Sequence, residues 1–296
     1  MNWAMAREVG ALDYILRRVL WRLHRLRGRP VAFPLPDGAK VALPLESPFA
    51  ADIYCTQGYV DWGSEQLLVQ YLQTLPKGVC IDVGANMGYY SCILSLHAAE
   101  VIAFEPDPRN HAALSAQNIP NLRLIAKAVS DAIGAASFDV SGTSAVGHLH
   151  PGAASTAQID VEMTTLDAWW RSQRNAPRVT AVKMDIEGHE IAALRGANEL
   201  VEANQPVLLI EYGMGDGLPN TVEELDAWLG HHRYEMFAMI RRPAPLWRFR
   251  TVLEKVHASD LPSLDFKMLF LVPLSDDFFT AQALSGFCFE TIRNHD

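Results

Sequence analysis

Val79 to Ser91 reads Val-Cys-Ile-Asp-Val-Gly-Ala-Asn-Met-Gly-Tyr-Tyr-Ser. Apart from Asp82, its first five residues are apolar or β-prone, which predicts a strand buried on both faces. Gly84 and Gly88 then bound a tight turn in which the backbone can approach a ligand closely, and a helical pattern follows. A strand, a glycine turn and a helix in this order predict a binding site at the carboxyl edge of a sheet.

The glycine spacing separates two classes of cofactor. A dinucleotide fingerprint needs Gly-x-Gly-x-x-Gly so that a pyrophosphate can sit at the helix end, whereas Asp82 to Gly88 reads Asp-x-Gly-x-x-x-Gly. A carboxylate at this position would repel a pyrophosphate and suits a cationic ammonium group, such as that of S-adenosylmethionine. Glu105 ends the next apolar run, where a carboxylate takes the two hydroxyls of a ribose. The alternative is an ordinary turn, with Glu105 as a solvated strand end.

Composition and charge argue against a nucleic-acid-binding protein and against a disulfide-bonded protein. The 296 residues have a formal net charge of −9, and an acidic body argues against nucleic acid as the main partner. The four cysteines form no Cys-x-x-Cys pair, which favours reduced thiols and a cytoplasmic location. We expect three parts: a basic amphipathic helix in residues 1–30, a cap in residues 31–75 and a main domain in residues 76–296.

The basic segment predicts one amphipathic helix over residues 3–27. Leucines, isoleucine and valine recur at spacings of three and four, and arginines occupy much of the rest. Three interpretations are open. The helix packs through its leucine face on the body or on a second subunit of a homo-oligomer, it lies peripherally on a membrane, or it contacts a partner protein.

The main domain alternates strands and helices, which predicts a mostly parallel, doubly wound α/β sheet. The expected strands are Val79–Val83, Val101–Glu105, Leu122–Val129, Ala181–Asp185, Val207–Tyr212, Tyr234–Ile240 and Phe266–Val272. Residues 241–265 separate the last two strands as an insertion, and loops of this length often cover a binding site.

A second chemical cluster is Lys183-Met-Asp-Ile-Glu-Gly-His-Glu190. Asp185 ends a strand, so it points into the ligand crevice, and Glu211 ends the neighbouring strand. Asp185 or His189 can accept a substrate proton, while the glutamates of the cluster can instead cap the next helix. The same side chains suit a divalent metal such as Mg²⁺, although the spacing does not require one.

Together these stretches resemble the FkbM family of S-adenosylmethionine-dependent methyltransferases. The resemblance covers about Val79 to Tyr212, and its most specific part is the Lys183–Glu190 element. It rests on Cys80–Ser91, Phe104–Pro106, Val129–Asp131, Thr165–Asp167 and Lys183–Glu190. It implies a class I methyltransferase fold, which is Rossmann-like, with a seven-stranded sheet whose last strand is antiparallel. It also implies an O-methyltransferase acting on a hydroxyl of a sugar, glycolipid or secondary-metabolite acceptor.

The resemblance also implies roles for individual residues. The methionine end of the cofactor would be held by Asp82, Gly84, Asn86 and Gly88. Glu105 would bind the ribose, with Pro106 beside the adenine. Asp131, in the Ser130-Asp131 pair, would meet the adenine amino group, and Asp185 would lie beside the methyl group. Two alternatives stay open: an NAD(P)-binding oxidoreductase on a Rossmann-like fold, and a non-catalytic S-adenosylmethionine-binding protein.

Overall fold

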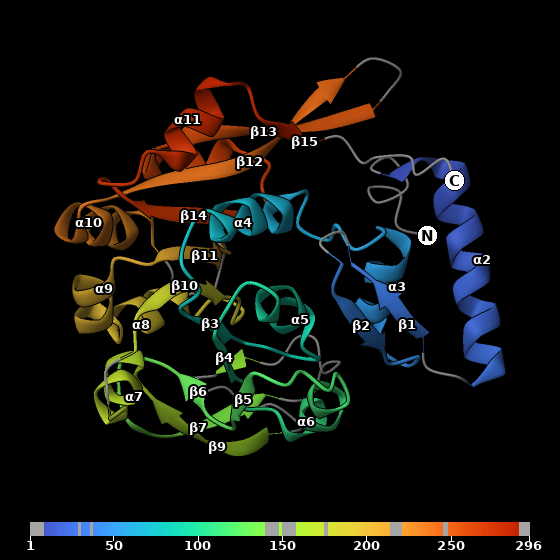
Figure 1. Ribbon diagram of the computed structural model, residues 1–296, viewed down its shortest axis with the longest axis horizontal. Helices are drawn as coiled ribbons and strands as arrows, with labels where there is room; N and C mark the ends of the chain where they lie inside the picture. The colour runs from blue at the N-terminus through green and yellow to red at the C-terminus, as the bar shows by residue number, and fades with distance from the viewer. Residues whose placement is uncertain are drawn as a thin grey trace.

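A mixed sheet forms the centre of the molecule, for which we have a computed structural model (Figure 1). The structure describes residues 9–28, 31–35, 38–139, 148–149, 158–174, 177–213, 221–244 and 248–289. Within these residues the sheet has nine strands, in the spatial order β15 (Cys288–Phe289), β13 (Arg248–Val256), β12 (Tyr234–Ala244), β14 (Met268–Pro273), β11 (Val207–Glu211), β10 (Val179–Met184), β3 (Val79–Val83), β4 (Glu100–Phe104) and β5 (Leu122–Ile125).

The strand directions confirm a mixed α/β sheet with mostly parallel strands. β5, β4, β3, β10 and β11 are parallel neighbours, and β14 runs antiparallel to both β11 and β12. Six of the seven strands expected from the sequence are present, and the reversed one is the expected Phe266–Val272. The expected strand Leu122–Val129 is divided, because only Leu122–Ile125 belongs to this sheet and Ala128–Val129 pairs elsewhere. The expected number of seven is wrong, because β13 and β15 add to the sheet beyond β12.

The segment 241–265 is not the loop that its length and charge suggest. β12 continues to Ala244, β13 pairs with it, and a 3-10 helix, η1 (Ala258–Ser263), follows. Two ion pairs join charged residues across this hairpin. Arg242 is 2.6 Å from Glu254, and Lys255 is bonded to Glu235. Cross-strand ion pairs on an exposed face therefore explain the dense charge.

Helices cover both faces of the sheet, so each strand residue faces one of two cores. One core lies under α4 (Ser64–Gln73), α5 (Tyr89–Ser95) and α11 (Phe278–Leu284), and the other lies under α7 (Leu166–Ser172), α8 (Glu190–Arg195), α9 (Asn198–Asn204) and α10 (Val222–His232). In β3, Cys80 belongs to the first core, and Ile81 and Val83 belong to the second. This alternation confirms the doubly wound arrangement.

The chain between β4 and β10 builds a smaller structure below the main sheet. α6 (Pro108–Ser115) packs Leu114 on Ala103 of β4. Four further strands form a separate sheet, in the order β6 (Ala128–Val129), β9 (Gln158–Thr164), β7 (Gly134–Asp139) and β8 (His148–Leu149). In this sheet β9 pairs antiparallel with β7 and parallel with β6.

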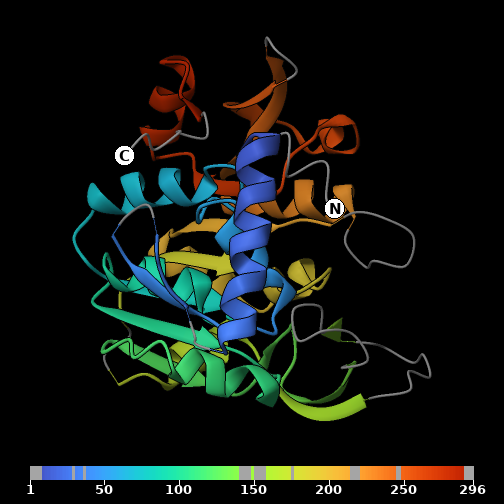
Figure 2. The same ribbon diagram turned by 90° about the vertical axis from the view of Figure 1, so that its right-hand side faces the viewer.

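The N-terminal segment lies along one side of the molecule (Figures 1 and 2). It contains α2 (Ala11–Arg27), a hairpin of β1 (Val31–Pro34) and β2 (Lys40–Leu43), and α3 (Pro48–Cys55). α2 packs on α3, and its leucines face away from the body, so the prediction that it packs there through the leucine face is wrong. No helix in the described parts of the chain has the length and apolar character of a membrane span. The division at residues 30 and 75 stays a prediction.

Candidate active site

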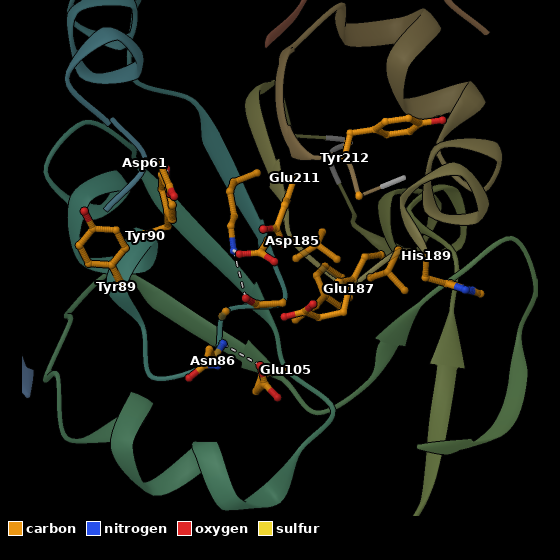
Figure 3. A pocket seen from close by; sticks show the side chains of 18 of the residues that line it. Asp61, Asn86, Tyr89, Tyr90, Glu105, Asp185, Glu187, His189, Glu211 and Tyr212 are labelled. Atoms are coloured by element: carbon orange, nitrogen blue, oxygen red, sulfur yellow. Dashed lines mark hydrogen bonds and ion pairs between the residues drawn. The ribbon is translucent and has the colours of Figure 1, made fainter. Parts of the chain in front are cut away.

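A cavity of about 810 Å³ opens where β3, β4, β10 and β11 end (Figure 3). Small-molecule sites usually have volumes of roughly 300–1,000 Å³. Residues that follow these strands form part of the wall. Other chain segments complete it with Phe49, Asp52, Asp61, Leu264, Phe266 and Lys267. The site is therefore assembled from both the predicted sheet edge and segments that no motif marks.

The glycine turn after β3 brings backbone to the cavity. Gly84 and Asn86 have positive φ angles of 75° and 51°, and both line the wall. A Cβ on Gly84 would lie 2.0 Å from the carbonyl oxygen of Asp185, so the turn and β10 can approach this closely only with glycine. Gly88, with φ of 93°, caps α5 and packs against Leu114 instead of lining the cavity.

Glu105 is fixed in the wall directly after β4. Its Oε2 accepts the backbone N–H of Asn86 at 2.6 Å. Its Oε1 accepts the backbone N–H of Asp107 at 2.9 Å and the side-chain amide of Asn110 at 3.2 Å. Burial raises the pKa of Glu105, and these hydrogen bonds oppose the rise. The turn and the carboxylate are thus held together as one rigid unit, with Pro106 next to them in the wall.

Lys183 of β10 links this unit to the second cluster. Its ammonium donates to the carbonyl oxygen of Gly84 at 3.1 Å and lies 3.5 Å from one carboxylate oxygen of Asp82 and one of Asp185. Burial alone would lower the pKa of Lys183, but the carboxylates, with Asp185 foremost, raise it above its usual value. Asp82 is fully buried, accepts a hydrogen bond from Ser91 at 2.6 Å and does not line the cavity. The structure therefore makes Asp82 the partner of Lys183.

Three carboxylates meet at the ends of β10 and β11. Oxygens of Asp185, Glu187 and Glu211 all lie within 4.8 Å of one another, and all three residues line the cavity. The charge of Asp185 is the main cause that raises the pKa of Glu211 to about 10. Burial disfavours the charge on Asp185, but Lys183 and a hydrogen bond from Glu211 hold its pKa below the usual value. The pair therefore shares one proton at neutral pH.

Glu187 differs from the other two carboxylates. Burial, followed by repulsion from Asp185 and Glu190, raises its pKa to about 7. Its backbone has a positive φ of 56°, a conformation that is costly for a residue other than glycine and is often found at functional sites. Glu190, by contrast, is fully buried and accepts the backbone N–H groups of Ile186 and Gly188. The sequence allows either glutamate to cap the next helix, but no side-chain hydrogen bond caps α8, and Glu190 instead holds the turn that precedes it.

Several predicted residues lie apart from this cluster. The ring of His189 points away from the carboxylates in Figure 3, and its Nε2 is 2.9 Å from the hydroxyl of Ser130. Burial lowers the pKa of His189. Asp131 is half-exposed and forms an ion pair with Arg195 at 3.2 Å. Neither Ser130 nor Asp131 lines the cavity, whose wall is formed here by Lys127, Ala128 and Val129.

Asp61 lies in a part of the cavity wall that no sequence motif marks. Asp61 accepts a hydrogen bond from the hydroxyl of Tyr90 at 2.7 Å, and burial raises its pKa. Glu65, fully buried behind it, accepts the backbone N–H of Asp61 and the hydroxyl of Tyr89. The only sequence signal is a pair of acidic residues four apart, which a helix start shows equally well.

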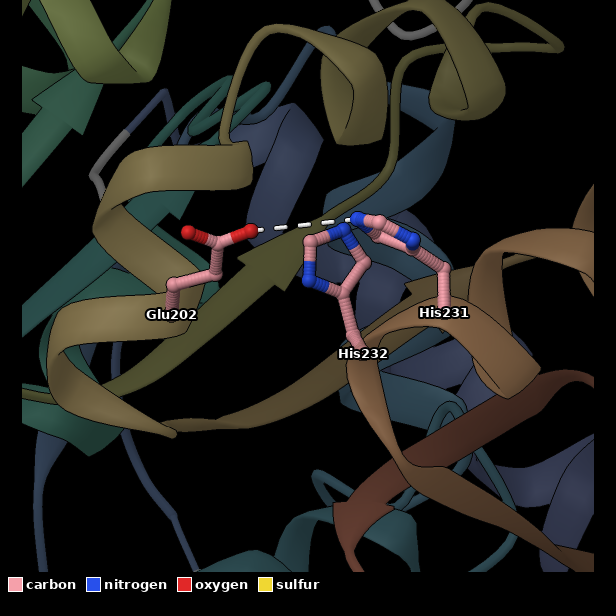
Figure 4. Close-up of side chains that lie close together, drawn as sticks. All are labelled: Glu202, His231 and His232. Carbon is pink, nitrogen blue, oxygen red and sulfur yellow. Dashed lines mark ion pairs between the residues drawn. The ribbon is translucent and has the colours of Figure 1, made fainter.

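A second group of potential metal ligands lies away from the cavity (Figure 4). It joins Glu202 of α9 to His231 and His232 of α10. Glu202 and His231 are exposed and 3.8 Å apart, and the Nε2 of His232 is 2.9 Å from the side-chain oxygen of Asn198. None of these residues lines the cavity, so the group has no part in the site.

A known protein family matches the part of the chain that carries these motifs. Residues 82–236 match the family described as "Methyltransferase FkbM domain". The chain belongs to the FkbM methyltransferase family. This confirms the family predicted from the sequence. The matched residues of the chain include the glycine turn, Glu105 and the three carboxylates.

Individual relatives match less completely. The hexuronic acid methyltransferase AglP of Haloferax volcanii is 31% identical over 137 residues, which are 45% of this chain and 56% of that protein. The chain therefore spans about half the length of this curated relative.

Solved structures similar to this chain are also distant in sequence. Methyltransferase FkbM from Methylobacillus flagellatus is 15% identical, with 75% of this chain and 54% of that chain covered and a TM-score of 0.42. A SAM-dependent methyltransferase from Agrobacterium tumefaciens is 9% identical, with 82% and 69% covered and a TM-score of 0.47. A putative methyltransferase from Streptococcus mutans, in complex with SAH, is 13% identical, with 70% and 96% covered and a TM-score of 0.36.

Proposed function

We propose that this protein transfers a methyl group from S-adenosylmethionine to a hydroxyl of a sugar or glycolipid acceptor. One observation carries the proposal. A single cavity joins the glycine turn and Glu105 to the carboxylates of Asp185, Glu187 and Asp61 (Figure 3). The family membership supports methyl transfer, and the order of the strands supports the class I fold.

The residues in the wall fit the cofactor. Glu105 presents a fixed carboxylate for the ribose hydroxyls, and Gly84 and Asn86 let the backbone approach the methionine end. Pro106 offers an apolar surface beside them. When bound, S-adenosylmethionine supplies a methyl group on a positively charged sulfur. The carboxylates of the wall give the cavity the negative potential that such a charge needs.

The acceptor hydroxyl must lose a proton, and Glu187 is the side chain best suited to take it. A general base works best with a pKa near the working pH, and the pKa of Glu187 is raised to about 7. Asp185, which the sequence offers as the base alongside His189, is kept ionised by Lys183 and is a weaker proton acceptor. His189 is turned toward Ser130. We assign a positioning role to Asp185: its carboxylate holds the ammonium of Lys183 in place and keeps the shared proton on Glu211.

The rest of the wall suits a carbohydrate. Asp52 and Asp61 can accept hydrogen bonds from sugar hydroxyls, and Phe49 and Phe266 offer aromatic surface. Lys267, whose ammonium donates to the carbonyl oxygen of Val60 at 2.6 Å, adds a cation that can pair with an acidic sugar. A relative named for methylation of hexuronic acid supports this class of acceptor.

The roles of metal and location stay predictions. Mg²⁺ can replace the shared proton among Asp185, Glu187 and Glu211, because carboxylate oxygens are its preferred ligands. Loss of methyl transfer in EDTA, restored by Mg²⁺, would establish that requirement. A cytoplasmic location and a homo-oligomer are likewise expected on sequence grounds alone.

Calorimetry with S-adenosylmethionine, S-adenosylhomocysteine and NADH tests the cofactor assignment. We expect the first two to bind, Glu105→Gln to weaken both by about tenfold or more, and Asp131→Asn to bind like the wild type. Asp131 is the matched control because it is an acidic residue of the predicted site that the structure places outside the wall. Binding of NADH alone would support the oxidoreductase and overturn the proposal.

Turnover is tested with methyl-labelled S-adenosylmethionine. We expect label on uronic acid glycosides in preference to neutral hexosides, and a loss of rate of about 10²-fold or more in Glu187→Gln. Cofactor binding without labelling of any hydroxyl acceptor, whether sugar, glycolipid or secondary metabolite, would favour the non-catalytic alternative.

A further inference from the structure

α2 has one side against the body and an apolar side that faces solvent. Tyr14 and Trp21, which are 1% and 4% exposed, pack toward α3, where the ring of Trp21 is 5.4 Å from that of Tyr54. The opposite side carries large apolar residues, and Leu12 and Leu26 are 84% and 83% exposed. This exposed apolar stripe consists of Leu12, Ile15, Leu16, Val19, Leu20, Leu23 and Leu26.

The stripe is the main concentration of exposed apolar surface in the described residues. It supplies seven of the eleven large hydrophobic side chains that are exposed there. At 100° per residue its members span an arc of roughly 140°, centred opposite Tyr14 and Trp21. Figure 2 shows the full length of α2 at the surface turned toward the viewer, in front of the rest of the chain. Such a surface usually marks a contact site.

The charges along α2 indicate which contact it is. The helix carries five arginines and one aspartate, whereas the whole protein has a net charge of −9. The 100° period places Arg22 at one edge of the exposed apolar stripe and Arg27 near the other. Arginine can lay its stem along an apolar surface and extend its guanidinium to a phosphate. Asp13, the acidic residue of α2, lies just outside the stripe next to Leu20, and no acidic residue lies within the stripe.

We propose that α2 binds an anionic lipid surface, with the exposed apolar stripe in the headgroup region and Arg22 and Arg27 on lipid phosphates. A two-fold dimer through the same stripe would set like charges against each other, because an isologous contact pairs a patch with itself. A lipid surface of negative charge complements the helix instead. At 17 residues the helix is about 25 Å long and lies along the surface.

The test is sedimentation of the full-length protein with vesicles. We expect binding to vesicles of equal parts phosphatidylglycerol and phosphatidylcholine, and about tenfold weaker binding to phosphatidylcholine alone or in 0.5 M salt. The variant Leu16→Gln, Val19→Gln, Leu23→Gln should bind the anionic vesicles about tenfold or more weakly. These side chains are exposed, so the fold should persist, and an unchanged melting temperature verifies it.

A matched control changes exposed apolar residues elsewhere. Leu96→Gln with Leu284→Gln removes two such side chains outside α2 and should leave vesicle binding unchanged. The proposal is overturned if the triple variant binds vesicles as the wild type does, or if the control weakens binding equally. The proposal is also overturned if the wild type does not bind vesicles and sediments as a dimer while the triple variant sediments as a monomer. That result would assign the stripe to a second copy of the chain.

Discussion

Replacing Glu187 with glutamine should stabilise the protein at alkaline pH and leave it nearly unchanged in acid. The pKa of Glu187 is about 7 in the folded protein against a usual 4.5, because burial and the neighbouring Asp185 and Glu190 disfavour its charge. The folded state therefore favours the protonated form. Its contribution to stability is complete below pH 4.5 and is lost as the pH rises through 7. At ~1.4 kcal/mol per pKa unit the shift corresponds to about 3.5 kcal/mol, and solvent screening of this partly exposed side chain reduces the loss in the wild type to about 3 kcal/mol.

The assay is urea unfolding of Glu187→Gln and of the wild type between pH 4.5 and 8.5. Glutamine is shaped like the protonated glutamate, so the two proteins should have similar free energies of unfolding near pH 4.5. By pH 8.5 the variant should be more stable by about 3 kcal/mol. Asp226→Asn, on the exposed side of α10, is the control for simple removal of a negative charge. A stability difference between variant and wild type that is constant with pH would refute the account of Glu187.

Three other substitutions test the contacts around the cavity. Gly84→Ala should lower the free energy of unfolding by about 3 kcal/mol or more, since its Cβ would lie 2.0 Å from a backbone oxygen at a positive φ. A wild-type midpoint in urea would contradict this close approach. Lys183→Met leaves Asp82 and Asp185 without their cation and should cost about 3–5 kcal/mol by the same measurement, whereas a loss below 1 kcal/mol would show the ion pairs to be weak. Asp61→Asn should raise the acceptor KM without changing the dissociation constant of S-adenosylmethionine measured by calorimetry. If the variant binds the cofactor more weakly, Asp61 belongs to the cofactor half of the cavity and its proposed contact with the acceptor is wrong.

The predictable part of the site is the part that is local in sequence. Val79–Val83 forms a strand with the expected bounds, because five buried residues before a glycine leave few other conformations. Gly84, Asn86 and Glu105 reach the wall because neighbouring parallel strands must end at the same edge. The motif does not reveal that Asp82 is used internally, since only the packed structure shows Lys183 beside it.

Elements that depend on distant partners could not be derived in the same way. The periodicity of α2 shows an apolar face. However, Tyr14 and Trp21 on the other side of the helix are more deeply buried, against α3. No pattern within the helix sequence predicts this choice of face. The charges of residues 241–265 suggest a solvated loop when their partners are unknown. Once β13 pairs with β12, the same charges form ion pairs across the hairpin.

The division of the cavity wall between chain segments has a consequence for how such enzymes diversify. The glycine turn, Glu105 and the three carboxylates lie inside the family-matched residues 82–236, whereas Phe49, Asp61 and Lys267 lie outside them. The half proposed for the donor thus lies within the family-matched residues, and the half proposed for the acceptor is contributed by flanking sequence. New acceptor preferences can then arise by exchange of those flanks while the shared half stays intact. A fragment trimmed to the matched residues would lack the flanking part of the wall.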